Sequence, residues 1–349
     1  MNIAIDITPL QTGHKNRGVG TYTKLLIEAL QKYEKNHSYS FFTRGQKVPK
    51  DIELIHYPYF DPFFVTLPLA FSKPTVVTVH DLIPFVFPEH FPSGFRGNIT
   101  WYYQKLRLAR VKRIIADSYC SKSDIGRITS IPLSKIDVVH LAPASTYRRI
   151  KDSHVLDGIQ KRYDLPDEFI LYVGDVNWNK NITGMLEAYK SVKRQASSVK
   201  LVLVGKAFLD VNIPEPQSIR SFVEHNHLQD SVVYVGSVPS VDLVAIYNLA
   251  SVYIQPSHYE GFGLPVLEAM ACGTPVVSSR AASLAEIAGP AIAVDPSDPQ
   301  DIARGILEAL TMTPVKRKAL IKAQTKWVQQ FSWERVVHQT IESYEKAIS

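Results

Sequence analysis

Short apolar runs alternate with amphipathic segments along almost the whole chain. The first series of runs lies at 3–7, 39–42, 54–56, 75–79, 113–117 and 136–140. A second series lies at 169–173, 200–204, 232–235, 252–254, 275–278 and 291–294, and helical periodicity fits 22–33, 182–195, 241–249 and 265–271. Because central strands of a parallel sheet are buried on both faces, they appear as apolar runs of this kind. The pattern therefore predicts an α/β chain with two doubly wound, Rossmann-like sheets.

The length of the chain also requires two domains. It has 349 residues, and a single hydrophobic core stops growing at roughly 250–300 residues. We predict an N-terminal domain at 1–160, a C-terminal domain at 161–330, and a helix at 331–349 that returns to the N-terminal domain. Ligands of open parallel sheets bind outside the carboxyl ends of the strands. A central cleft that the two domains face is therefore the expected site.

Composition narrows the cellular setting and the partners. Cys120 and Cys272 are too few for a disulfide framework or a four-cysteine metal site. There is no basic leader segment, and the apolar stretch 63–71 is too short to span a bilayer, which predicts a cytoplasmic protein. Residues 1–150 carry 20 Lys and Arg against 11 Asp and Glu, and the remainder carries 19 against 22. The N-terminal half should meet an anionic partner: a membrane surface, phosphates or a nucleic acid.

The most informative motif follows the run 252–254. It contains Glu260, Gly263, Pro265 and Glu268. Pro265 suits a first helical position, and the N–H groups around 263–266 would form an anion site supported by the helix dipole. Glu268 would lie in the first helical turn and could accept hydrogen bonds from the hydroxyls of a polyol. The plainer interpretation is a tight strand–helix turn with two solvated glutamates.

The whole stretch resembles the retaining glycosyltransferases of family four (glycosyl transferases group 1), which have the GT-B fold. The hallmark is a pair of glutamates separated by seven residues, here Glu260 and Glu268, and the likeness continues through 269–277 and 283–286. The resemblance implies that Glu260 contacts the donor sugar and Glu268 the ribose hydroxyls. It also implies that the backbone of Phe262, Gly263 and Leu264 faces the sugar and diphosphate. Independently, Ser283 and Glu286 form a capping-box pattern.

A lysine after the run 169–173 is suited to the departing diphosphate. Lys180 would supply a compact cation there. The family places an Arg or Lys shortly before this lysine, whereas this sequence has Asp175 after the glycine and Asn179 next to the lysine. The second phosphate contact is therefore open. Lys206 could replace it, or could be a solvated surface lysine.

Two N-terminal motifs complete the expected site. His80 and Asp81 follow the run 75–79, and the resemblance gives the histidine contacts with the donor sugar and β-phosphate. Asp81 either sets the imidazole tautomer or caps the next turn. The run 17–22 contains Gly18 and Gly20 but has Thr23 where a dinucleotide fingerprint needs a third glycine. The resemblance implies a flexible loop near the donor phosphates and the acceptor, and a plain helix start is the alternative.

Residues 96–113 carry six basic residues with interleaved Trp101, Tyr102 and Tyr103, and no acidic residue. On a helix, this segment could lie on an anionic membrane, or it could be a solvated face whose aromatic side chains pack inward. Nucleic acid is not expected, because no recognition motif accompanies the charge. The aromatic stretch 57–64 could line an acceptor cleft, contact a lipid carrier or pack as an ordinary loop. The sequence has no D-x-D motif, and we predict no metal.

Taken together, the resemblance implies retaining transfer of a hexosyl group, with mannose favoured, in polysaccharide biosynthesis. The donor is a nucleotide-diphosphate sugar, with GDP-mannose favoured as co-substrate, UDP- and dTDP-sugars left open, and no other cofactor. The acceptor is a hydroxyl of a glycan or lipid-linked glycan, and the protein is peripheral on the inner face of the plasma membrane. Lys180, Glu260 and His80 are the expected catalytic residues. The alternatives are a non-catalytic nucleotide-sugar-binding protein and a sugar-nucleotide epimerase or phosphorylase of similar architecture.

Overall fold

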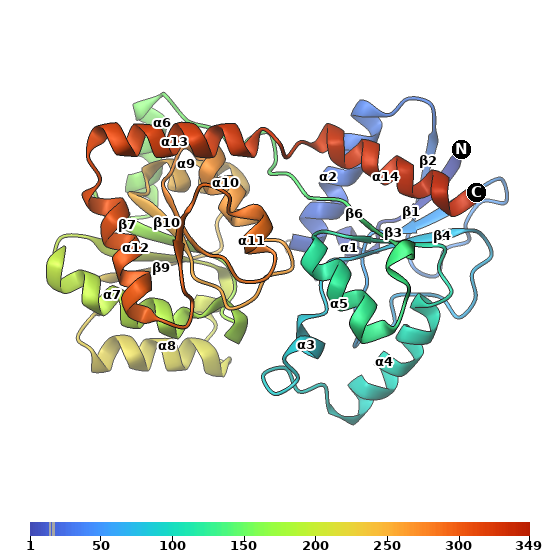
Figure 1. The fold of residues 1–349 in the computed structure, drawn as a ribbon, viewed down its shortest axis with the longest axis horizontal. Coiled ribbons are helices and arrows are strands. Elements are labelled where there is room, and N and C mark those ends of the chain that lie inside the picture. Colours follow the sequence, from blue (N-terminus) through green and yellow to red (C-terminus); the bar gives the residue numbers. More distant parts are fainter. Residues whose placement is uncertain (14, 16–17) are drawn as a thin grey trace. The chain divides into compact units, whose positions relative to one another are not determined.

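The computed structural model describes residues 1–13, 15 and 18–349, which form two compact units (Figure 1). Unit 1 comprises Met1–Ala142 and Phe331–Ser349, and unit 2 comprises Pro143–Gln330. The boundary thus lies between Ala142 and Pro143 and not at residue 160. The reason is that α6 (Ser153–Arg162) packs against α9 (Ser240–Leu249), which belongs to unit 2.

Unit 1 contains a parallel sheet with the strand order β2-β1-β3-β4-β5-β6 in the described residues. Its strands are β1 (Asn2–Asp6), β2 (Ser38–Phe42), β3 (Leu54–Tyr57), β4 (Thr75–Val79), β5 (Arg113–Ala116) and β6 (Ile136–Val138). Every run of the first predicted series therefore forms a strand. The neighbouring β3 and β4 are buried along their whole length, as strands covered on both faces must be.

Helices cover both faces of this sheet (Figure 1). One face carries α2 (Gly18–Tyr33) and α14 (Trp333–Ile348), and the other carries α4 (Gly94–Leu108) and α5 (Tyr119–Thr129). Two short helices, α1 (Thr8–Gln11) and α3 (Ile83–Val86), follow β1 and β4. The C-terminal helix α14 packs on α2 and on β3, β4 and β5, so the end of the chain completes the core of unit 1.

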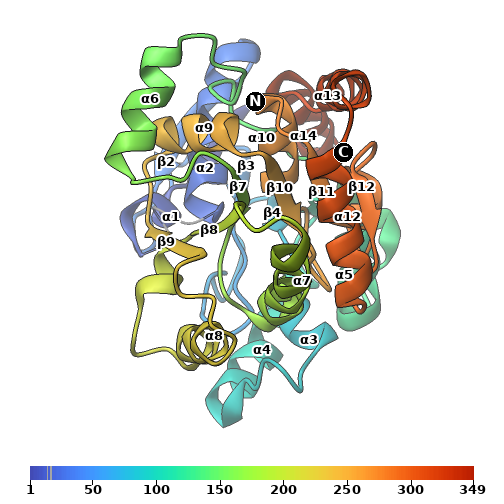
Figure 2. The ribbon, with the colours of Figure 1, turned by 90° about the vertical axis from the view of Figure 1, so that its left-hand side faces the viewer.

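Unit 2 contains a second parallel sheet with the strand order β12-β11-β10-β7-β8-β9 in the described residues. Figure 2 shows these strands side by side in this order. Its strands are β7 (Phe169–Val173), β8 (Lys200–Val204), β9 (Val232–Gly236), β10 (Val252–Gln255), β11 (Val276–Ser279) and β12 (Ile292–Val294). The chain builds outward from β7 to β9, then returns to place β10 on the other side of β7. The crevice between β7 and β10 is therefore the topological switch point, where sheets of this kind bind ligands.

Helices again cover both faces of the sheet. One face carries α7 (Ile182–Gln195), α8 (Pro214–His225) and α12 (Pro299–Thr311), and the other carries α6, α9, α10 (Leu264–Cys272) and α13 (Pro314–Val328), as Figures 1 and 2 show. The short α11 (Leu284–Ile287) follows β11. The predicted fold class, two doubly wound parallel sheets, is confirmed. Within the described residues, no helix combines the length and the apolar character needed to cross a bilayer.

The backbone after β7 and the backbone after β8 approach so closely that residue 205 must be glycine. A Cβ on Gly205 would lie 2.1 Å from the backbone oxygen of Gly174. Gly205→Ala should therefore lower the free energy of unfolding by about 1–3 kcal/mol, the usual cost of overpacking. Gly158 of α6 has open space around its Cβ position, and Gly158→Ala should raise stability by about 0.5–1 kcal/mol. Chemical denaturation of both variants measures the contrast, and equal effects would contradict it.

Candidate active site

The loops after β7 and β10 meet at the switch point of unit 2 through an ion pair. The Nζ atom of Lys180 lies 2.9 Å from Oε1 and 2.7 Å from Oε2 of Glu260. The Glu260 side chain is 8% exposed and the Lys180 side chain 21% exposed. Lys180 and Glu260, which belong to separate sequence motifs, therefore form one ion pair, and the lysine is its more exposed member.

Further donors hold the Glu260 carboxylate in place. Gln255 Nε2 donates to Oε1 at 2.8 Å and Ser257 Oγ donates to the same oxygen at 2.7 Å. The hydroxyl of Tyr253 in turn donates to the side chain of Gln255. Burial and the negative charge of Glu260 both raise the pKa of Tyr253 and Tyr172 well above the usual range. These tyrosines therefore stay protonated beside the carboxylate.

The two asparagines beside Lys180 fasten its loop to the loop after β10. Asn179 donates from Nδ2 to the Tyr259 carbonyl at 2.9 Å, and its own carbonyl accepts from the His258 N–H at 2.8 Å. Asn181 donates to the carbonyls of Pro256 at 3.0 Å and Pro296 at 2.7 Å. Sequence reasoning noted Asn179 only as the place of a missing arginine. Its physical role here is to position the backbone that carries Lys180.

The start of α10 supplies fewer amide donors than the sequence predicted. The Val266 N–H already donates to the Gly263 carbonyl at 3.1 Å, and Pro265 has no N–H. The N–H groups of Gly263 and Leu264 are left as candidate donors to an anion. Gly263 has φ +102°, and a Cβ there would lie 2.5 Å from Leu284 Cδ2, so this turn requires glycine.

The capping box predicted at Ser283 does not form. Ser283 has helical backbone angles, and its side chain caps no N–H of α11. Its Oγ lies instead 2.8 Å from the Glu260 carbonyl oxygen and 2.9 Å from that of Phe262. Phe262 is 5% exposed. The serine shapes the loop before Gly263, because tertiary contact offers its hydroxyl carbonyl partners that a local sequence pattern cannot reveal.

Glu268 is buried and is not a solvated side chain of the first helical turn. It is the fifth residue of α10 and 9% exposed. Tyr247 donates its hydroxyl hydrogen bond to Glu268 Oε2 at 3.0 Å, and the ring of Tyr147 packs edge-on against that of Tyr247 at 5.9 Å. Burial raises the pKa of Glu268 to about 7, although both tyrosines act to lower it.

In unit 1, His80 follows β4 and is paired with Asp117, which follows β5. His80 Nδ1 lies 2.6 Å from Asp117 Oδ2, and the Asp117 side chain is 3% exposed. Burial by itself would lower the pKa of His80, but the charge and hydrogen bond of Asp117 outweigh it and the pKa is raised. Asp81 accepts the Ile83 N–H at 3.1 Å and so caps the next turn. Sequence reasoning missed Asp117, whose only signal is its place directly after a strand.

A buried polar chain lies behind His80. His56 of β3 bonds Tyr344 of α14 through Nδ1 at 2.7 Å and Thr78 through Nε2 at 2.9 Å. Thr78 also contacts the hydroxyl of Tyr22, whose ring lies edge-on to His80 at 4.8 Å. Burial, and then the charge of His80, lower the pKa of His56 to about 3, so His56 is a neutral structural group.

Gly18 and Gly20 lie inside α2 and not in a loop. Gly18 is the first residue of this helix, and Gly20 is buried in its first turn. Arg17 lies outside the described residues. The flexible loop expected here is therefore wrong for these two glycines, since residues 18–33 form one continuous helix, whereas their contact with the donor stays a prediction.

Unit 2 thus brings together Lys180, Glu260, Phe262, Gly263, Leu264 and Glu268, at the carboxyl ends of β7 and β10. Within unit 1, His80 and Asp117 lie at the carboxyl ends of β4 and β5. Residues 1–13, 15 and 18–349 contain no group of three or more His, Cys, Asp or Glu that could hold a metal ion. That the reaction needs no metal stays a prediction.

Comparison with known proteins identifies the family. The model of the group 1 glycosyl transferases matches residues 159–327, and that of glycosyltransferase family 4 matches residues 48–142. The O-antigen chain mannosyltransferase B of Escherichia coli is 33% identical over 292 residues, covering 82% of this chain and 74% of that protein. The chain belongs to the group 1 glycosyltransferases of family 4. The serotype-specific mannosyltransferase WbdA of Escherichia coli is 30% identical over 298 residues. This aligned part covers 82% of this glycosyltransferase and 35% of WbdA.

The fold of this glycosyltransferase is that of solved relatives. The sucrose-phosphate synthase of Thermosynechococcus elongatus superposes with a TM-score of 0.76 at 21% sequence identity, covering 99% of this chain and 98% of that one. The predicted GT-B architecture of two Rossmann-like domains is thereby confirmed.

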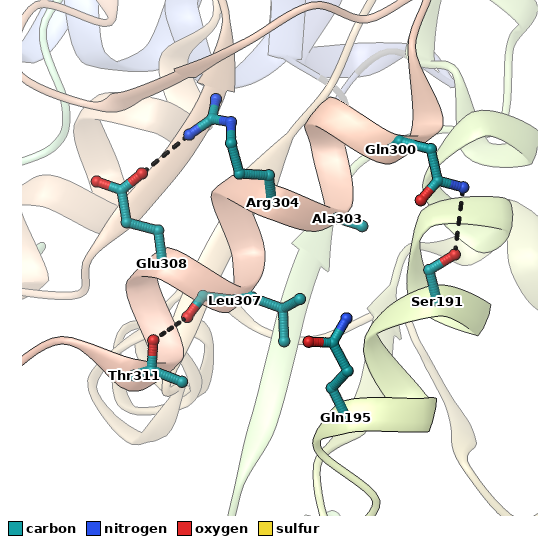
Figure 3. A pocket seen from close by; sticks show the side chains of 8 residues that line it. All are labelled: Ser191, Gln195, Gln300, Ala303, Arg304, Leu307, Glu308 and Thr311. Carbon is teal, nitrogen blue, oxygen red and sulfur yellow. Dashed lines mark hydrogen bonds and ion pairs between the residues drawn. The ribbon is translucent and has the colours of Figure 1, made fainter.

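A pocket elsewhere in unit 2 is not part of this constellation. It lies between α7 and α12, where Gln300 reaches Ser191 at 3.5 Å and Arg304 pairs with Glu308 at 2.9 Å (Figure 3). None of the expected site residues lines it. The candidate active site of the glycosyltransferase is therefore at the switch point between β7 and β10 and not between α7 and α12.

The His80–Asp117 pair generates a direct test. Asp117→Asn removes the charge that favours the imidazolium, so the His80 pKa should fall by about 1–3 pH units. The measurement is an NMR pH titration of the imidazole nitrogens, with the resonance assigned through His80→Gln. Asp124→Asn is the control, because Asp124 pairs with Arg127 on α5 instead. An unchanged His80 midpoint in Asp117→Asn would contradict the pairing.

Proposed function

We propose that this glycosyltransferase moves a hexosyl group, a mannosyl group in particular, from a nucleotide-diphosphate sugar to a hydroxyl of a glycan or lipid-linked glycan, with retention of the anomeric configuration. GDP-mannose is the favoured donor. The observation that carries the proposal is the Lys180–Glu260 pair at the switch point of unit 2. The names of two relatives, O-antigen chain mannosyltransferase B and WbdA, support mannose as the sugar.

Lys180 stabilises the departing diphosphate in this proposal. An ammonium group has three N–H donors, and the two oxygens of Glu260 account for two of them. The third can point to a phosphate oxygen from the accessible side of the lysine. The N–H groups of Gly263 and Leu264 add fixed donors, and such preorganised donors act where negative charge develops. Glu268 accepts hydrogen bonds from the ribose.

Glu260 serves as an anchor and not as a covalent nucleophile. Its Oε1 accepts from Lys180, Gln255 and Ser257, and its charge is matched by the lysine. A front-face reaction is therefore favoured: the bond from the anomeric carbon to the phosphate oxygen breaks, and the bond to the acceptor oxygen forms on the same face. The acceptor proton passes to the departing diphosphate. His80, held by Asp117, contacts the donor sugar.

Removal of the lysine should affect turnover far more than binding. Lys180→Ala should lower kcat by about 10²–10³-fold, as loss of one preorganised donor does, while the Kd for GDP rises less than tenfold. The measurements are transfer of radiolabelled mannose to a mannose-terminated acceptor and calorimetric titration with GDP. Because an unpaired Glu260 would destabilise unit 2, the double variant Lys180→Met with Glu260→Gln is tested in parallel. It removes both charges and should be equally impaired.

Lys322→Ala is the matched control, since Lys322 is an exposed lysine on α13; it should keep full activity. Lys206→Ala reports whether the exposed lysine after β8 supplies the second phosphate contact. Comparable turnover in Lys180→Ala and the wild type would remove Lys180 from the mechanism. An epimer formed without acceptor, or phosphate-dependent release of a sugar phosphate, would contradict transfer. Binding of GDP with no reaction of any acceptor would favour a non-catalytic role.

The partner of unit 1 is an anionic membrane surface that holds the lipid-linked acceptor. The stripe Phe95, Ile99, Tyr102 and Leu106 on α4 is exposed by 81%, 43%, 62% and 45%. The opposite face of α4 is anchored, because Gln104 donates to the Phe64 carbonyl at 2.9 Å. The neighbouring Phe64 is 70% exposed. Spacing of three and four residues gives an amphipathic helix with aromatic side chains suited to the headgroup region.

The basic residues of 96–113 support this surface only in part. Lys105, Arg107 and Arg113 bond the Ile128 carbonyl, the Leu67 carbonyl and Asp137. Arg96, Arg110 and Lys112 are left to face an anionic lipid. By sequence, unit 1 carries 20 Lys and Arg against 14 Asp and Glu, whereas unit 2 carries 19 of each. The positive charge of the chain is therefore in the unit that has α4.

Vesicle flotation tests the surface. Wild-type protein should float with vesicles of 30% phosphatidylglycerol at low salt, and Phe95→Ser with Ile99→Ser should reduce the bound fraction at least about tenfold, because two apolar side chains no longer leave water. Val241→Ser is the matched control, since Val241 is 71% exposed in unit 2. No binding of the wild type would indicate a soluble acceptor. Equal loss in the control would show that the effect is not specific to α4.

A further inference from the structure

The buried polar chain behind His80 ends on the C-terminal helix α14. Its members are Tyr344, His56, Thr78 and Tyr22, and all four are buried. The Nδ1 atom of His56 lies 2.7 Å from the Tyr344 hydroxyl, and its Nε2 atom lies 2.9 Å from Thr78 Oγ1. Thr78 Oγ1 in turn lies 3.2 Å from the hydroxyl of Tyr22 on α2. The proposed mechanism gives these four side chains no role.

The ring of His56 makes the positions of the two hydroxyls beside it depend on each other. Burial lowers the pKa of His56 to about 3, so the ring is neutral and has one N–H donor and one acceptor nitrogen. If Tyr344 donates to Nδ1, then Nε2 donates to Thr78, and in the other tautomer both bonds run the opposite way. Without the Tyr344 hydroxyl, Nδ1 would lose its partner in the core, which a buried polar atom tolerates poorly.

The helix α14 is a firm support for the polar chain. It packs on α2 and on β3, β4 and β5. Ser343 and Lys346 of this helix donate to Oδ2 and Oδ1 of Asp137 in β6, at 2.9 Å and 3.2 Å. Burial raises the pKa of Tyr344 well above its usual range, so its hydroxyl keeps its hydrogen. The helix therefore holds this hydroxyl at a fixed position beside β3 and β4.

Tyr22 brings the polar chain into contact with His80. Its ring lies edge-on to the imidazole, with 4.8 Å between the ring centroids and 86° between the ring planes. Trp333, the first residue of α14, packs on the same tyrosine at 6.4 Å. Other supports of His80 act on different atoms: Asp117 contacts Nδ1 at 2.6 Å, and Ser121 donates to the His80 carbonyl at 2.9 Å. The ring of Tyr22 therefore restricts the tilt of the imidazole plane.

We infer that Tyr344 of α14 is a positioning residue for His80: through the polar chain, the last helix of the protein sets the orientation of the imidazole. The inference rests on the proposed function, because it concerns the histidine that contacts the donor sugar there. Catalytic groups need supporting side chains that are themselves locked by packing and hydrogen bonds. The C-terminal helix thus takes part in the reaction as well as in the core of unit 1.

NMR of the His80 imidazole tests the geometry directly. In Tyr344→Phe the helix keeps its aromatic packing and loses only the hydroxyl. The ring of Tyr22 should then move relative to His80, and the His80 resonances should shift at both ends of a pH titration, because an aromatic ring changes the magnetic field at its neighbours. The midpoint of the titration should stay at the wild-type value, since Asp117 still pairs with Nδ1.

Kinetics test the consequence for the reaction. Tyr344→Phe and Thr78→Val each remove one hydroxyl of the polar chain at nearly constant shape. Both should lower kcat for mannosyl transfer about tenfold, because misplaced catalytic groups lose rate steeply. The Kd for GDP should not change, since its proposed donors lie in unit 2. Thr78→Ser keeps the hydroxyl and should keep most of the rate, which a general loss of packing would not explain.

Tyr189→Phe is the matched control. Tyr189 is a buried tyrosine of α7 in unit 2, and its hydroxyl donates to the carbonyls of Val199 at 2.9 Å and Ser231 at 3.0 Å. Its replacement removes a buried hydroxyl of the same kind outside the polar chain, so kcat and the His80 resonances should not change. Thermal unfolding of each variant shows whether the fold is kept. If Tyr344→Phe does not fold, Thr78→Val provides the same test.

The outcomes separate this inference from the proposed function. Unchanged His80 resonances in Tyr344→Phe and Thr78→Val would overturn the inference and leave the proposed function standing. Shifted resonances with wild-type kcat would show that the polar chain orients a histidine that the reaction does not need, which also overturns the inference and removes His80 from the mechanism. If the wild type transfers no mannose, the proposed function fails, and the inference fails with it.

Discussion

The ion pair between Lys180 and Glu260 is the interaction on which the site of unit 2 depends. It joins the loops after β7 and β10, the two strands between which the sheet reverses its order. Two buried charges are costly unless each is well paired and hydrogen-bonded. Here Gln255 and Ser257 complete the carboxylate. The asparagines on either side of the lysine hold its backbone, so the pair is fixed before any nucleotide arrives.

The candidate site residues include three buried carboxylates. Each has a different hydrogen-bond or ion-pair partner, and the partner gives each carboxylate a different role. Glu260 is matched by a lysine and acts as an anchor. Asp117 faces His80, and its charge and hydrogen bond raise the pKa of the imidazole. Glu268 accepts a hydrogen bond from the Tyr247 hydroxyl, and burial raises its pKa to about 7. All three side chains are largely removed from water, and the nature of the partner decides the role that each carboxylate can take.

Several predictions were wrong for one common reason. They rest on the local sequence, whereas contacts with residues distant in the sequence determine the position of the side chain or helix. Ser283 fits a capping box by spacing, yet its hydroxyl meets the Glu260 and Phe262 carbonyls. Glu268 is expected in the first helical turn, but it is the fifth residue of α10 and is buried beside Tyr247 of α9. The predicted domain boundary at 160 would cut through α6. The boundary lies before this helix, because α6 packs on α9 of unit 2. Half of the basic residues in 96–113 are used inside unit 1.

The sequence by itself determined both parallel sheets, since apolar runs of strand length with helical segments between them leave few other folds. It also determined the family, because the two glutamates lie in a long run of matching residues, and it pointed to Lys180 and His80 through their places after strands. Only the tertiary structure decided the partners: Asp117 for His80, Glu260 for Lys180, and Tyr247 for Glu268. The physical reason is that hydrogen bonds and desolvation depend on which side chains meet across strands and loops, and residues as far apart as 180 and 260 carry no local sign of meeting.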